Sequence, residues 1–225
     1  MKQISYSLFG TQAKYYIGAE KNLEINKILL PDWQNVIYFH PSMTNMENVE
    51  KLNSLGASMV DVTTLPNIGI DYIHFPYFWR FLSFFQGSIS ISRDLDSRVS
   101  MREVNYINKW LDSNKDFFII RDHPWHSPVP AGLIGMRGER QDFVEHFVNF
   151  VNTQSLAWGA DQTILHEFKE KTDENMWFYC GFNESENYIP RDDQNFFIGM
   201  QIDENDNPLD PSAIVALKFL SEMNL

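Results

Sequence analysis

Short apolar runs alternate with amphipathic stretches along the first half of the chain. The runs and the period-two alternations predict strands at residues 4–9, 35–40, 57–62 and about 88–93. Apolar positions three and four residues apart predict helices at residues 13–30 and 45–55, and the aromatic stretch 78–85 is also expected to be helical. Helices that alternate with strands are typical of βαβ units, whose parallel strands form one sheet. The first half of the chain therefore predicts an α/β fold.

The pattern changes at Arg121, where residues 121–138 become rich in Gly, Pro and His. In the second half, helices are expected at residues 101–112, 143–151, 161–169 and about 211–223, and short strands at 117–120, 176–179 and 196–200. Ser100 and Glu103 form a capping box at the start of the first of these helices. No internal repeat or linker divides the sequence, so we expect one domain over residues 1–225.

The composition fits a globular protein with many aromatic side chains. Apolar residues make up 44% of the 225 positions and aromatic residues 15%, enough for a large core with rings left over for a ligand cleft. A net charge of −12 without a basic run disfavours nucleic acid and anionic membrane surfaces as partners. A nucleotide can still bind through a few Arg side chains or a metal.

The cysteine count and the apolar runs indicate a compartment. Cys180 is the only cysteine, which excludes an intrachain disulfide and a C-x-x-C motif and fits a reducing environment. The N-terminus lacks the apolar core of a signal peptide, and no run of about 18 apolar residues predicts a transmembrane segment. We therefore expect a soluble, cytoplasmic protein.

Two carboxylates follow the strand in which Ile alternates with Ser. Asp94 and Asp96 should lie on one side of an extended chain, because strand side chains repeat every second residue. Such a pair can bind a hard divalent cation, and the neighbouring Arg93 and Arg98 suit a phosphate-bearing ligand. For a D-x-D motif taken alone, the commoner explanation is a strand that leads into an acidic turn.

Position in the sheet favours function over that explanation. An α/β sheet binds ligands beyond the carboxyl ends of its strands, and Gly10, Asp61 and the Asp94–Asp96 pair all follow predicted strands. Arg80 lies among aromatic side chains, so it either pairs with an anion or reaches out to solvent.

Three later segments also carry candidate chemistry. The Arg121-Asp122-His123-Pro124-Trp125-His126 segment could bind a metal or supply an acid and a base; a salt bridge with surface His residues is the alternative. The glycines in 131–138 match neither a P-loop nor a dinucleotide fingerprint, and indicate bare backbone for a close approach. Asp161 opens a helix, where it could also be an ordinary cap.

Taken in order, these motifs resemble glycosyltransferases of the GT-A fold, particularly the glycogenin and lipopolysaccharide galactosyltransferase group. They are even more similar to a group of uncharacterised bacterial and large-virus glycosyltransferase-like proteins. The matching pieces run from residue 9 to about 200: Tyr15-x-x-Gly18-x-x-x-Asn22, Pro31-Asp32-Trp33, Phe78-Trp79-Arg80-Phe81, Arg93-Asp94-x-Asp96-Ser97-Arg98, Arg121-Asp122-His123-Pro124-x-His126 and Asp161-Gln162.

The resemblance implies a Rossmann-like GT-A fold, a mixed, mostly parallel sheet flanked by helices. It also implies transfer of a sugar from a nucleotide-diphosphate sugar, UDP first among the nucleotides, to a carbohydrate acceptor. Asp94 and Asp96 would hold Mn²⁺ or Mg²⁺ against the diphosphate, as a Lewis acid for the leaving group. Arg80 and Arg98 would contact the phosphates or the donor sugar.

The remaining roles also follow from the resemblance. The nucleoside pocket would be lined by Phe9, Gly10, Tyr15 and Asp61, and Gly132 would leave room for the donor. Asp161 and Gln162 would face the reacting carbon, and Asp122 and His123 the donor sugar or the acceptor. The galactosyltransferases often complete the metal site with a C-terminal His, whereas no His follows His166 here. The third ligand of the metal could therefore be His123, His126 or a water molecule.

Two alternatives remain at the level of sequence. A haloacid-dehalogenase-like phosphatase also carries D-x-D after an apolar strand, normally on its first strand and followed by Thr or Val. A nucleotide-sugar-binding module without turnover would keep the same fold. The stereochemistry is open as well, because Asp161 could serve a retaining reaction or act as the base of an inverting one.

Overall fold

The computed structural model describes residues 1–154, 156–182, 186–191 and 195–222. Its strands are β1 (Lys2–Leu8), β2 (Gln34–Phe39), β3 (Ser58–Asp61), β4 (Ile89–Arg93), β5 (Phe117–Arg121), β6 (Leu133–Arg137) and β7 (Trp177–Gly181). Its α-helices are α1 (Ala13–Leu29), α2 (Met46–Ser54), α3 (Met101–Asp112), α4 (Gln141–Thr153), α5 (Ala160–Lys171) and α6 (Pro211–Glu222). Its 3₁₀ helices are η1 (Pro41–Met43), η2 (Val62–Thr64), η3 (Tyr72–His74), η4 (Pro76–Phe85) and η5 (Glu174–Met176).

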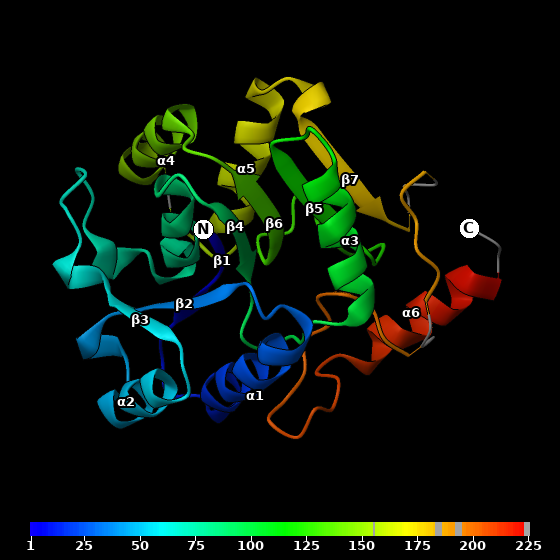
Figure 1. Cartoon of the computed structure of the whole chain (residues 1–225), viewed down its shortest axis with the longest axis horizontal. Helices are drawn as coiled ribbons and strands as arrows, with labels where there is room; N and C mark the ends of the chain where they lie inside the picture. The colour runs from blue at the N-terminus through cyan, green and yellow to red at the C-terminus, as the bar shows by residue number, and fades with distance from the viewer. Residues whose placement is uncertain (155, 183–185, 192–194, 223–225) are drawn as a thin grey trace.

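The strands form one seven-stranded sheet in the order β3-β2-β1-β4-β6-β5-β7 (Figure 1). Only β6 runs antiparallel to its neighbours β4 and β5 within this sheet. The carboxyl ends of β1, β4 and β5 therefore lie at the same edge as the start of β6. This edge is the one at which ligands bind in α/β sheets.

Each face of the sheet has its own apolar core. On one face, alternate side chains of β1 such as Ile4, Tyr6 and Leu8 pack against α1, α2 and α3. On the other face, the aromatic side chains of η4 pack against α4 and α5, with Phe117 and Ile119 of β5 beneath them. Figure 1 shows α1 and α2 together on one side and α4 and α5 together on the other. Both faces of the sheet are thus covered, as a mostly parallel sheet requires.

Most predicted elements are present, with shifted ends. Residues 78–85 fall in a 3₁₀ helix, η4, and Gly56 follows α2 with a φ of +100° that suits a glycine at a helix end. The Ser100 hydroxyl caps α3 by accepting the Glu103 backbone N–H at 3.2 Å. The Glu103 side chain does not complete the capping box: it is buried and pairs with Arg93 at 3.2 Å. The last helix is described to Glu222, and Met223 lies outside the described residues.

Two expectations in the second half are wrong. Residues 196–200 form no strand: the chain turns there, with Gly199 at a φ of +86°, and the Ile198 N–H donates to a side chain instead of a neighbouring strand. A strand that the sequence pattern missed, β6, occupies 133–137 in the middle of the sheet. Its short run, Leu-Ile-Gly-Met-Arg, is interrupted by Gly135, whose bare Cα faces the ring of Trp110. Among the described residues, no helix has the length and apolarity needed to cross a membrane.

Candidate active site

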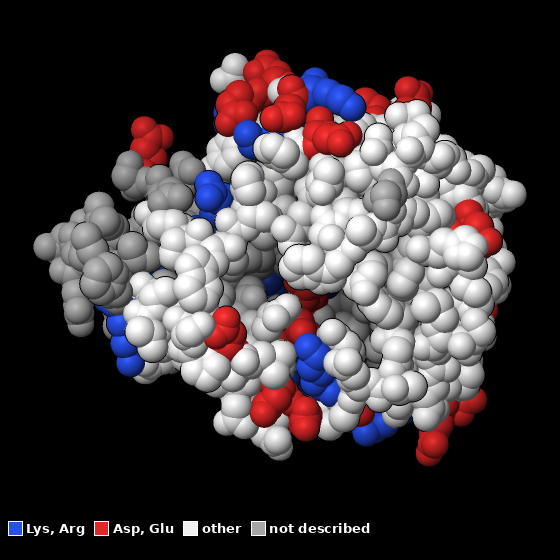
Figure 2. Space-filling view, turned by 180° about the vertical axis from the view of Figure 1, so that it is seen from behind, with Lys and Arg blue, Asp and Glu red and all other residues white. Residues whose placement is uncertain are grey.

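A cavity of about 500 Å³ opens at the carboxyl edge of the sheet, which is the size range of small-molecule sites. Figure 2 shows a hollow in which acidic and basic side chains meet. The cavity is lined by nine of the residues to which the resemblance gives a definite role, namely Phe9, Tyr15, Arg80, Asp94, Asp96, His123, Gly132, Asp161 and Gln162, and also by the further candidates Arg93 and His126. Four others do not line it: Gly10, Asp61, Arg98 and Asp122.

Arg80 joins two carboxylates of the cavity, Asp94 and Asp161, and we call this arrangement the Arg80 junction. Its guanidinium donates from Nη1 to Asp94 and from Nη2 to Asp161, the latter at 2.6 Å. Burial would lower the pKa of Arg80, but the two carboxylates more than offset that effect and raise it. Arg80 is therefore a fixed cation between an acid at the end of β4 and an acid in the first turn of α5.

Serine side chains of β1 hold the backbone of Arg80 in place. The Ser7 Oγ accepts the Arg80 N–H at 2.9 Å, and the Ser5 Oγ donates to the Arg80 carbonyl at 2.5 Å. Both contacts satisfy backbone groups of η4 from the neighbouring strand β1. The guanidinium is thus positioned by the sheet as well as by its ion pairs.

The Asp94-Leu95-Asp96 segment departs from its prediction. The strand ends at Arg93 and residues 95–97 turn, so the two carboxylates do not follow an extended chain. Asp96 is buried and pairs with Lys14 of α1 at 2.8 Å, whereas Asp94 pairs with Arg80. Burial and the charge of Asp94 raise the pKa of Asp96, and Lys14 opposes the shift.

Helix α1 packs directly against this turn, which explains part of the motif 15–22. A Cβ at Gly18 would lie 2.1 Å from the Leu95 carbonyl oxygen, so only a glycine allows this approach. The same oxygen accepts from Asn22 Nδ2 at 3.3 Å and from Arg98 Nη1 at 3.1 Å. Gly18, Asn22 and Arg98 therefore fix the turn from behind.

Asp94 and Asp96 can serve a divalent cation only together with a ligand. The described part of the chain holds no group of three or more His, Cys, Asp or Glu side chains suited to a metal ion. A Mg²⁺ that binds against a diphosphate needs one or two carboxylates, because phosphate oxygens and water complete its shell. Asp94 and Asp96 both line the cavity, and the charge of Asp94 helps to raise the pKa of Asp96. The two carboxylates fit a diphosphate-bound cation and do not form a closed protein cage.

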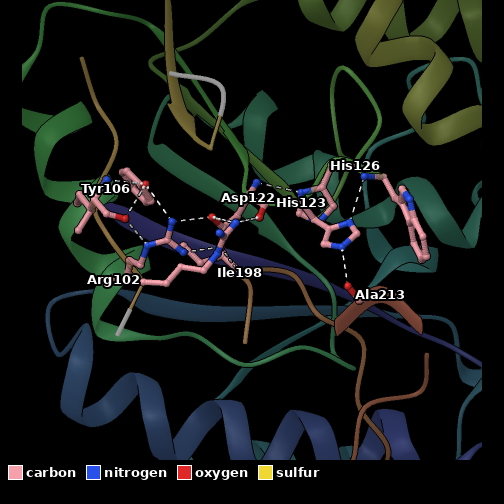
Figure 3. Close-up of polar contacts among 10 residues, drawn as sticks. Arg102, Tyr106, Asp122, His123, His126, Ile198 and Ala213 are labelled. Carbon is pink, nitrogen blue, oxygen red and sulfur yellow. Dashed lines mark hydrogen bonds and ion pairs between the residues drawn. The ribbon is translucent and has the colours of Figure 1, made fainter. Parts of the chain in front are cut away.

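Asp122 does not line the cavity, and its side chain is held by protein groups (Figure 3). Its carboxylate is fully buried, accepts from both Nη atoms of Arg102 at 2.5 and 2.6 Å, and accepts the Ile198 N–H at 2.8 Å. Arg191 donates to the Asp122 carbonyl at 2.6 Å. The prediction that Asp122 faces the sugar or the acceptor is not supported by this geometry, because its oxygens are turned to the protein. Asp122 instead fastens Arg191 and Ile198 to the end of β5.

Hydrogen bonds fix the tautomers of His123 and His126. The His123 Nδ1 accepts the Trp125 N–H at 3.1 Å and its Nε2 bonds the Ala213 carbonyl at 3.0 Å, so neither nitrogen is available as a base or a metal ligand (Figure 3). The His126 Nδ1 accepts the Asp122 N–H at 3.2 Å, which places the proton on Nε2. Burial, with nearby His123 and Arg121, lowers the pKa of His126 to about 3. His126 is thus a neutral side chain that lines the cavity and can donate, not coordinate.

The other three predicted residues, Gly10, Asp61 and Arg98, do not line the cavity and make contacts within the protein. Gly10, two residues after β1, has a φ of +81° and donates to the Met43 carbonyl, and the Asp61 carboxylate caps η2 by accepting the Thr63 N–H at 2.9 Å. Arg98 pairs with Asp206 at 3.1 Å.

Sequence reasoning missed Lys14, Tyr77 and Trp158 as site residues. Lys14 pairs with Asp96, while Tyr77 and Trp158 line the cavity. A Lys directly before the Tyr15 motif was the only sequence signal for any of the three.

Known proteins were compared with the sequence and the fold. No protein-family model matches the chain, and no curated protein sequence matches it. A crystal structure of glucosyl-3-phosphoglycerate synthase from Mycobacterium tuberculosis in complex with phosphoglyceric acid is similar, with a TM-score of 0.51 and 10% identity over 100% of this chain and 80% of that one. A second structure of the M. tuberculosis synthase gives a TM-score of 0.50 and 10% identity over 100% of this chain and 81% of that one.

A mannosyltransferase from Pyrobaculum calidifontis, solved in complex with GDP-Man and Mn²⁺, gives a TM-score of 0.46 and 11% identity over 79% of this chain and 55% of that one. At about 10% identity, the likeness to the synthase concerns the fold alone. It confirms the predicted fold class: the chain has a GT-A, Rossmann-like architecture, with a mixed, mostly parallel sheet flanked by helices.

Proposed function

We propose that this protein is a glycosyltransferase that uses a nucleotide-diphosphate sugar and a divalent cation, Mn²⁺ or Mg²⁺. A UDP-sugar is the first donor to test. The observation that carries the proposal is the Arg80 junction, where one buried guanidinium holds Asp94 and Asp161 together in the cavity of a GT-A-type sheet. In this proposal the guanidinium, whose planar fork suits phosphate oxygens, lies beside the acids that would meet a metal and a reacting sugar carbon.

The charge balance of the cavity supports a metal. The charged residues that line it are two guanidiniums and four carboxylates, namely Arg80, Arg93, Asp94, Asp96, Asp161 and Asp210. A nucleotide diphosphate would bring further negative charge into this acidic cavity, which Coulomb repulsion opposes. A divalent cation between the diphosphate and the Asp94–Asp96 pair would remove that repulsion. When bound, it would also neutralise the diphosphate as the latter leaves.

The chain's own residues have the following roles in this proposal. Phe9 and Tyr15 line the nucleoside end of the cavity, and Phe9 is held by an edge-to-face contact with Tyr77 at 5.1 Å. Arg80 contacts the diphosphate or the donor sugar, and Gly132 leaves the space that the Asp94 carboxylate needs. Asp161 and Gln162, at the start of α5, face the reacting carbon.

The reaction exchanges one C–O bond for another. The bond between the anomeric carbon and the diphosphate oxygen breaks, the diphosphate leaves with its electron pair, and a hydroxyl oxygen of the carbohydrate acceptor bonds to the carbon. The acceptor proton passes to a base, either Asp161 or the leaving phosphate oxygen. The anomeric configuration of the product, measured by NMR, separates retention from inversion.

Calorimetry with a panel of nucleotide sugars, with and without Mn²⁺, tests the proposal. We expect Mn²⁺-dependent binding and slow hydrolysis of one donor, and a loss of at least about tenfold in donor affinity for Asp96→Asn, with a native circular dichroism spectrum. Asp32→Asn, at an exposed turn outside the cavity, is the matched control and should bind as the parent does. Equal donor affinity in Asp96→Asn and the parent would refute the metal assignment. Donor binding without hydrolysis or transfer would favour a binding module without turnover.

A further inference from the structure

Two tryptophans are exposed at the cavity. Trp158, just before α5, is 88% exposed and Trp125, in the loop between β5 and β6, is 57% exposed, yet both line the cavity. Two exposed indoles on one cavity are typical of a binding surface, since each ring offers a large apolar face and a polar N–H. No ring contact holds Trp158 among the aromatic pairs of the described residues.

The sheet order separates these indoles from the nucleoside end. The carboxyl end of β4, which carries Asp94, lies between β1 on one side and β6 and β5 on the other. Phe9 follows β1, whereas Trp125 follows β5. Trp158 lies three residues before Asp161, which Arg80 joins to Asp94. Trp125 thus lies across β4 from Phe9, and the part of the cavity lined by Trp125, Trp158 and Asp161 is called the tryptophan end.

The charges at the tryptophan end favour a neutral ligand over an anionic one. The charged lining residues at this end are Asp161 and Asp210, and both are acidic. Arg80 is paired with Asp94 and Asp161, and the buried Arg93 is paired with Glu103, although the Arg93 Nη2 has no hydrogen-bond partner among the described residues. A phosphate or carboxylate at this end would meet Asp210 and an Asp161 that shares Arg80 with Asp94, so the local charge favours a neutral ligand. A ligand with many hydroxyls and no charge would meet acceptors for its O–H groups and apolar faces for its C–H groups.

We propose that Trp125 and Trp158 form the acceptor subsite, and that the acceptor is a neutral sugar ring stacked on these indoles. This inference rests on the proposed function and adds the class of acceptor to it. The M. tuberculosis synthase was solved with phosphoglyceric acid, an anion. The acidic tryptophan end of the present cavity assigns a different class of acceptor to this protein.

The test combines donor turnover with direct binding of probe sugars. The parent is incubated with Mn²⁺, the nucleotide sugar that it hydrolyses, and either neutral probes (methyl glycosides, lactose, cellobiose) or anionic ones (glucose 6-phosphate, 3-phosphoglycerate). Saturation-transfer NMR on the same probes, without donor, reports binding alone. We expect at least one neutral probe to bind and to yield a product, and none of the anionic probes to do so.

Variants then locate the subsite. Trp158→Ala should raise the KM for the neutral probe roughly tenfold, the size expected from loss of one aromatic stack. The KM for the neutral probe should change more than the affinity for the nucleotide does. Trp158→Phe should restore most of the affinity, whereas Trp158→Leu, apolar but not aromatic, should not. Ile28→Ala removes a similarly exposed apolar side chain, at 79%, from outside the cavity and is the control for folding.

Four results would overturn the subsite. They are no binding of any neutral probe, better use of an anionic probe, an unchanged KM in both Trp158→Ala and Trp125→Ala, or, in Trp158→Ala, a loss of nucleotide affinity at least as large as the rise in KM. The last would make the indole a platform for the base. Failure of the proposed function is distinguishable, because the parent would then neither bind nor hydrolyse any nucleotide sugar, whatever the neutral probes do.

Discussion

Gly132→Ala should disable the site while leaving the fold almost intact. Gly132 precedes β6 at the edge of the cavity, and its φ is not in the left-handed region, so alanine can adopt its backbone. The added Cβ would lie 1.9 Å from Oδ2 and 2.6 Å from Cγ of Asp94. Something must move, and the end of the Asp94 side chain is the atom group with the most freedom.

The displacement can be estimated from these contacts. Ordinary van der Waals contact begins at 3.4 Å, so the Asp94 oxygen must withdraw by about 1.5 Å from its present 1.9 Å. A shift of that size moves the carboxylate off Arg80 and away from any cation shared with Asp96. A 1 Å misplacement of a catalytic group costs about 100-fold in rate, and we expect at least that loss in donor hydrolysis. Because Asp94 is 39% exposed, the free energy of unfolding should fall by only about 1 kcal/mol.

Gly138→Ala is the matched control. Gly138 has a φ of +78°, and no atom lies within 4 Å of the place that a Cβ would take, so alanine costs about 1–2 kcal/mol through the backbone and displaces no side chain. The two variants should show similar thermal midpoints, while only Gly132→Ala loses Mn²⁺-dependent donor hydrolysis. Parent-like hydrolysis in Gly132→Ala would refute the placement of Asp94 at the reaction centre. The double variant Gly132→Ala, Asp94→Ala should be no worse than Asp94→Ala alone, because the methyl group then has nothing to displace.

The other predictions concern the buried charges. Asp122→Asn should lower the free energy of unfolding, measured in urea, by about 3–5 kcal/mol, because it leaves Arg102 buried without its full partner. The control Asp116→Asn removes a carboxylate from a half-exposed pair with Arg140 and should lower it by less than about 1 kcal/mol. Burial raises the pKa of Glu103 to about 7, although Arg93 opposes the shift. The contribution of Glu103 to the free energy of unfolding is therefore fully present below pH 4.5 and is lost as the pH rises from 4.5 to about 7. The parent should therefore lose stability relative to Glu103→Gln across that window, and a constant difference would contradict the assignment. His126 should keep the neutral Nε2–H tautomer from about pH 5 to 8 in ¹⁵N imidazole spectra, whereas a titration near pH 6.5 would show that its burial is wrong.

The sequence was sufficient for the elements whose pattern reflects burial alone. The βαβ alternation up to residue 93 follows from apolar spacing, and the structure reproduces it with ends shifted by a residue or two. The pattern failed at β6, where Gly135 gives way to the ring of Trp110 and breaks the alternation. It failed again at 196–200, where an apolar run serves a turn that Asp122 holds in place. In both cases a tertiary contact overrides local propensity.

The same distinction applies to the site. The spacing of Asp94 and Asp96 identified the segment, but the assumption of an extended chain gave the wrong local geometry. The partners of the two acids are Lys14, 82 residues from Asp96 in the sequence, and Arg80, 14 residues from Asp94. Spacing along one strand cannot show such pairings, because they depend on which helices pack at the end of that strand. Ordered motifs located the site, and only the fold could assign each side chain its partner.

The serines of the two central strands connect these observations. Alternation of Ser with apolar residues usually indicates a strand with one wet face. Here Ser5, Ser90 and Ser92 are fully buried, and Ser5 donates to the backbone of η4 while Ser92 donates to the Ala131 carbonyl at 2.8 Å. The serine side chains of this face are therefore buried and hydrogen-bonded. They hold the backbone of Arg80 on one side and the backbone before Gly132 on the other. Because buried hydroxyls must be hydrogen-bonded, their small side chains set the position of both segments more strictly than apolar packing would. The serine pattern of the strands thus reflects the construction of the site rather than exposure to solvent.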